Sequence, residues 1–142
     1  MISSLDTYKS YFNGLATELG CSFVYANKGR LIDKQLSQIV YPVLWVPVPD
    51  VRLAIEDGKQ YIFQGAAVFL TNAAADDYEA QDSALNSMLS LATAAIEKLM
   101  DDSPGNFVFD ADGVAMDHVA FWSGDNDWGW KLEFEIGGSI IC

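Results

Sequence analysis

Apolar residues recur at steps of three and four near the start of the chain, which is the spacing of one face of an amphipathic helix. Ser3 or Ser4 can cap the first amide groups of such a helix, and Gly20 is suited to its end. The pattern therefore predicts a first helix over residues 5–19. Its apolar stripe consists of Leu5, Tyr8, Phe12, Leu15, Ala16 and Leu19.

A second helical stripe, the clearest in the chain, runs through residues 85–100. The run 76–79 (Asp-Asp-Tyr-Glu) opens this helix with acidic residues at the positive end of its dipole, and Asp76 and Asp77 are interpreted as solvated caps. The run 101–105 (Asp-Asp-Ser-Pro-Gly) ends it. A shorter stripe over 31–40 predicts a third, minor helix. The stripe of the long helix is Leu85, Met88, Leu89, Ala92, Ala95, Ile96, Leu99 and Met100.

Residues 130–136 alternate strictly between apolar and polar side chains, which predicts a strand with one buried and one wet face. Further extended segments are expected at 22–25, 107–109 and 114–122. Residues 51–71 are expected to form a hairpin, with Gly65 marking a bulge in its longer arm.

The segment 41–47 is also expected to be extended. Pro42 and Pro47 cannot donate to a ladder, so this segment is expected at a sheet edge or as a strand with broken ends. The order of elements predicts an α+β fold, an antiparallel β-sheet with two main helices packed on one face.

The chain has 142 residues, the size of a single domain, so we expect one α+β domain over residues 1–142. Its 51% hydrophobic and 13% aromatic content excludes intrinsic disorder. Two cysteines, Cys21 and Cys142, make no disulfide framework and favour a reduced, intracellular setting. The first residues do not resemble a secretory signal, and no apolar run approaches bilayer length, so no membrane role is expected.

The negative charge is unevenly distributed along the chain. Residues 1–60 contain six basic and six acidic residues, whereas residues 61–142 contain two basic and fourteen acidic ones. The whole net charge of −12 therefore belongs to the second part, which predicts one strongly negative face. This charge argues against a nucleic-acid reader and suits solubility, repulsion of a polyanion or contact with a basic partner.

No residue pattern predicts catalysis, a cofactor or a metal site, and we expect the protein not to be an enzyme. The run 110–113 (Asp-Ala-Asp-Gly) lacks EF-hand spacing and is interpreted as an acidic hairpin turn. Asp125 and Asp127, in the loop 123–127, are candidate ligands for a hard cation, although a polar loop between two strands explains them equally well. Asp117 and His118 are strand neighbours that face opposite ways, so they make no natural acid–base pair. Cys21 follows a helix end and is interpreted as a core residue.

Three tryptophans flank one acidic loop near the C-terminus. Trp130 alternates with the buried face, whereas Trp122 and Trp128 are candidates for partial exposure. Exposed tryptophan is a common interface anchor, and near Asp125 and Asn126 it would also suit a carbohydrate-stacking site.

Three segments together resemble the small head–tail joining proteins of tailed bacteriophages, most closely the tail-terminator or tail-completion type. They are the run 41–46 (Tyr-Pro-Val-Leu-Trp-Val), the helix ending 96–99 (Ile-Glu-Lys-Leu), and the run 125–134 (Asp-Asn-Asp-Trp-Gly-Trp-Lys-Leu-Glu-Phe). The resemblance implies a structural virion subunit, assembled in the bacterial cytoplasm into a ring that is typically a hexamer. The ring would join the tail tube to the head connector, and DNA would pass through it without specific binding.

Ring contacts are heterologous, so each subunit needs two different patches. An exposed strand edge at 41–46 is expected to pair between subunits. Two alternatives stay open. One is a small acidic inhibitor or DNA mimic that binds a basic partner, and the other is a carbohydrate- or ligand-binding module centred on Trp122 and Trp128. The candidate residues of the partner interface are Tyr41, Leu44, Trp45, Trp122 and Trp128.

Overall fold

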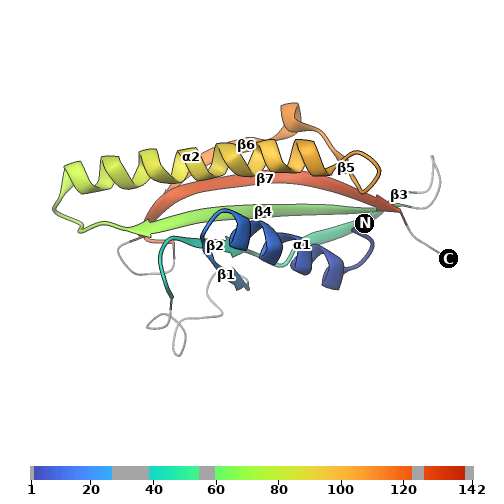
Figure 1. Ribbon diagram of the computed structural model, residues 1–142, viewed down its shortest axis with the longest axis horizontal. Coiled ribbons are helices and arrows are strands. Elements are labelled where there is room, and N and C mark those ends of the chain that lie inside the picture. Colours follow the sequence, from blue (N-terminus) through green and yellow to red (C-terminus); the bar gives the residue numbers. More distant parts are fainter. Residues whose placement is uncertain (1, 27–38, 55–59, 123–126, 140–142) are drawn as a thin grey trace.

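Two long antiparallel strands form the centre of the molecule (Figure 1). In the computed structural model, which describes residues 2–26, 39–54, 60–122 and 127–139, these strands are β4 (Gln60–Asn72) and β7 (Asp127–Ser139). They pair over 13 residues without interruption, from Gln60 opposite Ser139 to Asn72 opposite Asp127. All other described strands are added to the two sides of this pair.

Each outer edge of the central pair is hydrogen-bonded to two short strands, which follow one another along that edge. On the β4 side lie β2 (Val43–Val46) and β3 (Asp50–Ala54), both antiparallel to β4. On the β7 side lie β5 (Val108–Phe109) and β6 (Ala115–Ala120), both antiparallel to β7. The remaining strand, β1 (Ser22–Tyr25), pairs with β2 in parallel.

The described chain therefore forms one seven-stranded sheet that is mostly antiparallel, as predicted, with one parallel pair of strands. The exception is the pair β1–β2. Its two strands are joined by the segment 26–42, which is long enough for the crossover that parallel strands need.

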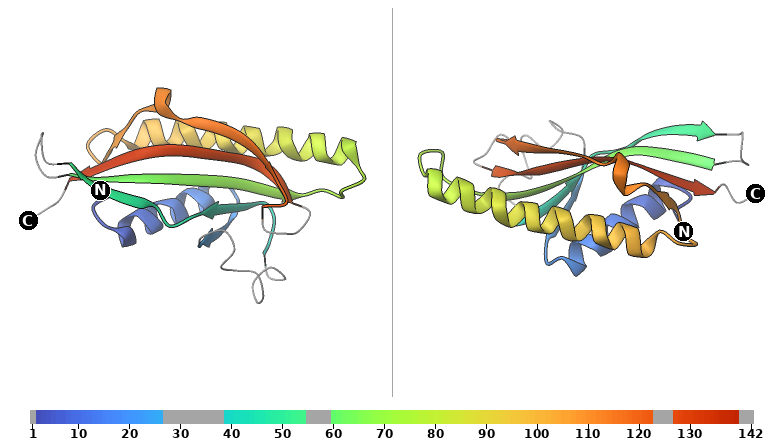
Figure 2. Two further views of the ribbon diagram at one scale, coloured as in Figure 1. Left: turned by 180° about the vertical axis from the view of Figure 1, so that it is seen from behind. Right: turned by 90° about the horizontal axis from the view of Figure 1, so that it is seen from above.

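Both helices lie on the same face of the sheet, as predicted, and the fold is of the α+β class (Figure 2). Helix α1 (Leu5–Glu18) begins at Ser4, whose hydroxyl accepts a hydrogen bond from the amide of Thr7, and Gly20 follows its end with φ +75°. Helix α2 (Tyr78–Asp102) begins at Asp77, whose carboxylate accepts from the amide of Ala80. Both predicted caps are confirmed.

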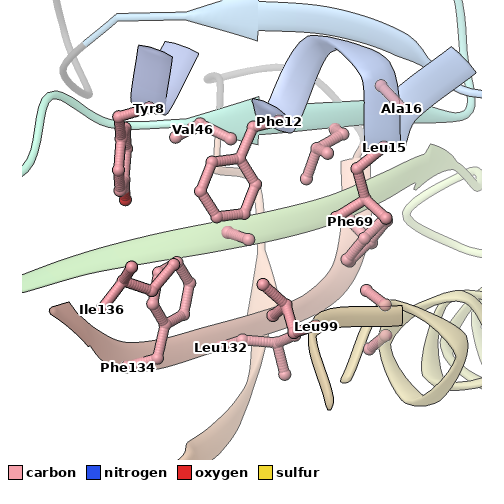
Figure 3. Packing of buried hydrophobic residues seen from close by; sticks show 14 of the residues in the cluster. Tyr8, Phe12, Leu15, Ala16, Val46, Phe69, Leu99, Leu132, Phe134 and Ile136 are labelled. Carbon is pink, nitrogen blue, oxygen red and sulfur yellow. The ribbon is translucent and has the colours of Figure 1, made fainter. Parts of the chain in front are cut away.

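The main core fills the space between the helices and the sheet (Figure 3). Side chains from α1 and α2 meet those of β4 and β7, and rings such as Phe12 and Phe134 stack at 5.5 Å between centroids. A second, smaller cluster lies on the opposite face of the sheet at one end. It consists of Val43, Trp45, Val68 and Leu70, with Val24, Ile39, Tyr41, Val119 and Trp122 packed against it.

Two local predictions are wrong, and of the two alternatives predicted for the segment 41–47 only one fits. The segment 41–47 is not a sheet edge, because β2 is paired with β1 on one side and with β4 on the other; its short length fits the alternative of a strand with broken ends. Gly65 marks no bulge, because it stays in register opposite Phe134. Residues 111–113 form a short 3-10 helix, η2, between two strands that both pair with β7, so they are not a hairpin turn.

The 51–71 hairpin is confirmed as β3 and β4. The minor helix predicted over 31–40 falls almost wholly outside the described residues.

Candidate functional site

Two of the five predicted interface residues are buried inside the subunit. Leu44 is 0% exposed and Trp45 is 1% exposed, and the indole Nε1 of Trp45 donates to the carbonyl of Ala26 at 2.7 Å. They belong to β2, whose two edges are already paired. The prediction that they anchor a partner at the surface, through an exposed strand edge, is therefore wrong.

Tyr41 and Trp122 are half-buried at the smaller core cluster. The hydroxyl of Tyr41 donates to the carboxylate of Asp127 at 3.3 Å, and Asp127 is 0% exposed. The ring of Trp122 stands perpendicular to that of Trp45, with 6.4 Å between centroids. Asp127 therefore has a structural partner at this end of the sheet, whereas Asp125 lies outside the described residues.

Trp128 lies on the other face of the sheet from Trp122. Its Nε1 donates to the carbonyl of Ala73 at 3.2 Å, and its ring packs 5.1 Å from that of Phe121. Trp128 shares the helix-covered face with Trp130, while Trp122 packs on the opposite cluster. The two candidate indoles therefore form no common platform for stacking a sugar.

The residues considered for chemistry are not assembled into a reactive group. Asp117 is in register with Lys131 and His118 with Trp130, so the two neighbours face opposite ways, as predicted. The Asp110 carboxylate accepts from the amide of Asp112, which stabilises the local turn. Within the described ranges, no group of three or more His, Cys, Asp or Glu side chains is placed to hold a metal ion.

The prediction that Cys21 is a core residue is confirmed. Its side chain is buried against the main cluster, and burial raises the pKa of its thiol. A neutral thiol at neutral pH is a poor nucleophile, so this environment favours packing over reactivity.

The most distinctive surface is the open face of the sheet, opposite the helices. A groove of about 570 Å³ crosses it, and carboxylates from three separate segments line it: Asp50 of β3, Asp110 before η2, and Glu133 and Glu135 of β7. Glu135 accepts from the amide of Gln64 at 3.0 Å, and Glu133 pairs with Lys131 at 2.6 Å. We name this surface the acidic face.

Sequence analysis found only part of the acidic face. The alternation of residues 130–136 predicted that Glu133 and Glu135 face solvent, which is confirmed. It did not place Asp50 and Asp110 beside them, because that proximity depends on which strands pair. A period-two reading of residues 50–54 would have put Asp50, Arg52 and Ala54 on one side of a strand.

Two open edges of the sheet, those of β3 and β6, were not predicted from the sequence. In the described part of the chain, β3 pairs only with β4 and β6 pairs only with β7, so each leaves one edge unpaired. These edges lie on opposite sides of the central pair. Val51 and Leu53 of β3 are 45% and 51% exposed, which is unusual for large apolar side chains of a strand.

Comparisons with known proteins add no family. No family model matches the chain, and no curated protein matches it. In the ranges that the structure describes, no helix is both long enough and apolar enough to cross a membrane.

Proposed function

We propose that the chain is a structural virion subunit of a tailed bacteriophage, of the tail-terminator or tail-completion type. It acts by assembly into a ring, with six copies as the expected number. The ring joins the tail tube to the head connector in the virion, after assembly in the host cytoplasm. The resemblance of residues 41–46, 96–99 and 125–134 to such proteins is the origin of this proposal.

The observation that carries the proposal is the pair of unlike open edges, β3 and β6, on opposite sides of one sheet. A subunit with two different, mutually complementary surfaces forms heterologous contacts. Such contacts produce a closed ring when the rotation from one copy to the next divides a full turn evenly. A single self-complementary surface would instead favour a twofold dimer.

The charge distribution also supports the proposal. DNA has a dense array of negative phosphates, and a conduit for DNA must not retain it. The carboxylates of the acidic face stand on a surface that the helices leave open, where they would repel phosphates. A net charge of −12 for the whole chain acts in the same direction.

Electron microscopy and proteomics of purified particles test the proposal. We expect the chain in intact virions of the phage that encodes it, located as a ring between the tail tube and the head connector. Light scattering on the purified chain should report a ring, or a monomer that assembles when tail tubes are added. Absence of the chain from purified virions would contradict the proposal.

The groove on the acidic face supports a second candidate, a small acidic inhibitor of a basic protein. Carboxylates gathered on one concave surface suit lysine and arginine side chains, and such complexes weaken steeply as salt increases. The test is capture of a basic host protein whose affinity falls in the double variant Glu133→Gln/Glu135→Gln. Unchanged affinity in that variant would exclude the acidic face as the binding surface.

A further inference from the structure

We propose that the open edge of β3 in one copy pairs with the open edge of β6 in the next, so that one sheet continues across the contact. This inference rests on the proposed ring function and deepens it by naming the contact. The partner is a second copy of this chain.

The β3 edge has the character of an unprotected interface. All of Asp50–Leu53 is exposed, and the strand has no described neighbour on its outer side. Val51 and Leu53 point to the helix side of the sheet, like their register partners Phe63 and Tyr61, yet about half of each side chain is exposed. Natural proteins normally cover or charge such an edge, because it templates pairing with another chain.

The β6 edge matches the β3 edge in length and in the character of its faces. β3 has five residues and β6 has six, so at about 3.4 Å per residue the two edges are about 17 Å and about 20 Å long. Asp117 of β6 is exposed on the open face, while Met116 is half-buried on the helix side. In a continuous sheet Met116 would stand on the same side as Val51 and Leu53.

Charge selects this pairing over pairing of like edges. Arg52 is exposed on the open face of β3, and it has no ion pair in the described chain, whereas Lys98 and Lys131 each have one. Joining β3 to β6 brings Arg52 to the same face as Asp117. Joining β6 to β6 would instead bring Asp117 near its own copy, and like charges across adjacent strands are destabilising.

Two other open edges of the described sheet are weaker candidates, those of β1 and of β5, and β5 has only two residues. β1 also has only one described neighbour, but all four of its residues are half-buried and α1 packs on it.

The contact has a consequence for the acidic face. A sheet that continues from copy to copy keeps its open side on one surface of the ring. Glu133 and Glu135 of every copy would then form a continuous acidic band on that surface. Such a band suits the wall along which DNA passes.

Charge reversal at the two edges tests the contact. We expect Arg52→Glu and Asp117→Lys each to weaken self-assembly of the full chain at least about tenfold, because each places like charges together. The double variant should recover most of that loss. Glu97→Lys, an exposed reversal on α2, is the matched control and should assemble like the natural chain. Light scattering measures assembly, and circular dichroism checks that each variant is folded.

Cross-linking provides an independent readout that also works inside particles. An Arg52→Lys variant, treated with a carbodiimide, should form an intermolecular amide between positions 52 and 117, identified by mass spectrometry. Asp117→Asn should abolish it. Assembled rings without this link, and with no sensitivity to the charge reversals, would overturn the edge contact and leave the proposed function standing. The link in a chain that is absent from virions would support the contact and overturn the function.

Discussion

The two faces of the central strands differ in character, although their residues alternate along the same two segments of the chain. On one face of β7, Phe134 and Ile136 are buried beneath the helices; on the other, their neighbours Glu133 and Glu135 are exposed. β4 repeats this contrast with buried Phe63 and exposed Gln64. The fold is therefore stabilised mainly from one face, and a large part of the other face is available for contacts between molecules.

The largest expected effect is a deletion on the helix-covered face. Phe12 is 0% exposed and stacks on Phe134. We expect Phe12→Ala to lower the free energy of unfolding by about 3–5 kcal/mol, because it removes a buried ring and leaves a cavity. Urea denaturation followed by circular dichroism measures the change.

The matched control for this deletion is Tyr78→Ala at the start of α2. Tyr78 is 77% exposed, so its loss should change stability by about 0.5 kcal/mol or less. Equal losses from the two substitutions would contradict the view that the helix-covered face dominates stability.

A smaller effect is expected where α1 approaches the sheet most closely. The hydroxyl of Tyr8 occupies the space where any Cβ at Gly65 would lie. We therefore expect Gly65→Ala to cost about 1–3 kcal/mol through overpacking. Adding Tyr8→Phe should return part of this loss, because it removes the clashing oxygen. Thermal unfolding of the two single variants and the double variant measures the coupling.

If the changes in stability caused by Gly65→Ala and Tyr8→Phe simply add in the double variant, the hydroxyl of Tyr8 is not the cause of the overpacking at position 65. Tyr8→Phe alone should be neutral or stabilising, because its buried hydroxyl has no hydrogen-bond partner within the described chain.

Features that depend on nearby residues could be predicted from the sequence. Ser4 and Asp77 cap their helices as expected, and residues 130–136 alternate as expected, because each pattern acts within a few residues along the chain. The pairing of β3 with β4 is local in the same sense, because only five residues separate the two strands in the sequence.

Features that depend on strand pairing could not be predicted in this way. Pro42 and Pro47 predicted either an edge strand or a strand with broken ends. The first alternative is wrong, because four residues without proline are enough for two short ladders and the strand pairs on both sides. Leu44 and Trp45 were consequently placed at the surface, whereas both are buried. The open edges, and the position of Asp50 and Asp110 beside Glu133 and Glu135, arise from the same long-range pairing, so no local pattern revealed them.

The dependence of stability on alkaline pH also distinguishes the buried face from the exposed one. Burial, and secondarily the charge of Tyr25, raises the pKa of Tyr8 above its ordinary value near 10. Above that value the unfolded chain ionises at Tyr8 while the folded chain does not, so stability falls as pH rises. We expect the contribution of Tyr8 to reach a loss of about 1.4 kcal/mol at pH 11.

Urea titrations of the natural chain and of Tyr8→Phe at pH 9 and pH 11 measure this contribution. The variant should lose less stability between the two pH values. Parallel pH dependence in both proteins would mean that Tyr8 is accessible to solvent in the folded state.

The smallest expected effect is on the acidic face, one residue from the buried ring of Phe134. Glu135 is exposed and accepts a hydrogen bond from Gln64, so Glu135→Gln should change the free energy of unfolding by about 0.5 kcal/mol or less. Phe134→Ala, its matched neighbour on the opposite face, should cost about 3–5 kcal/mol in the same urea titration. A loss above about 1 kcal/mol for Glu135→Gln would show that this face also stabilises the subunit. In that case the contrast between the two faces would fail.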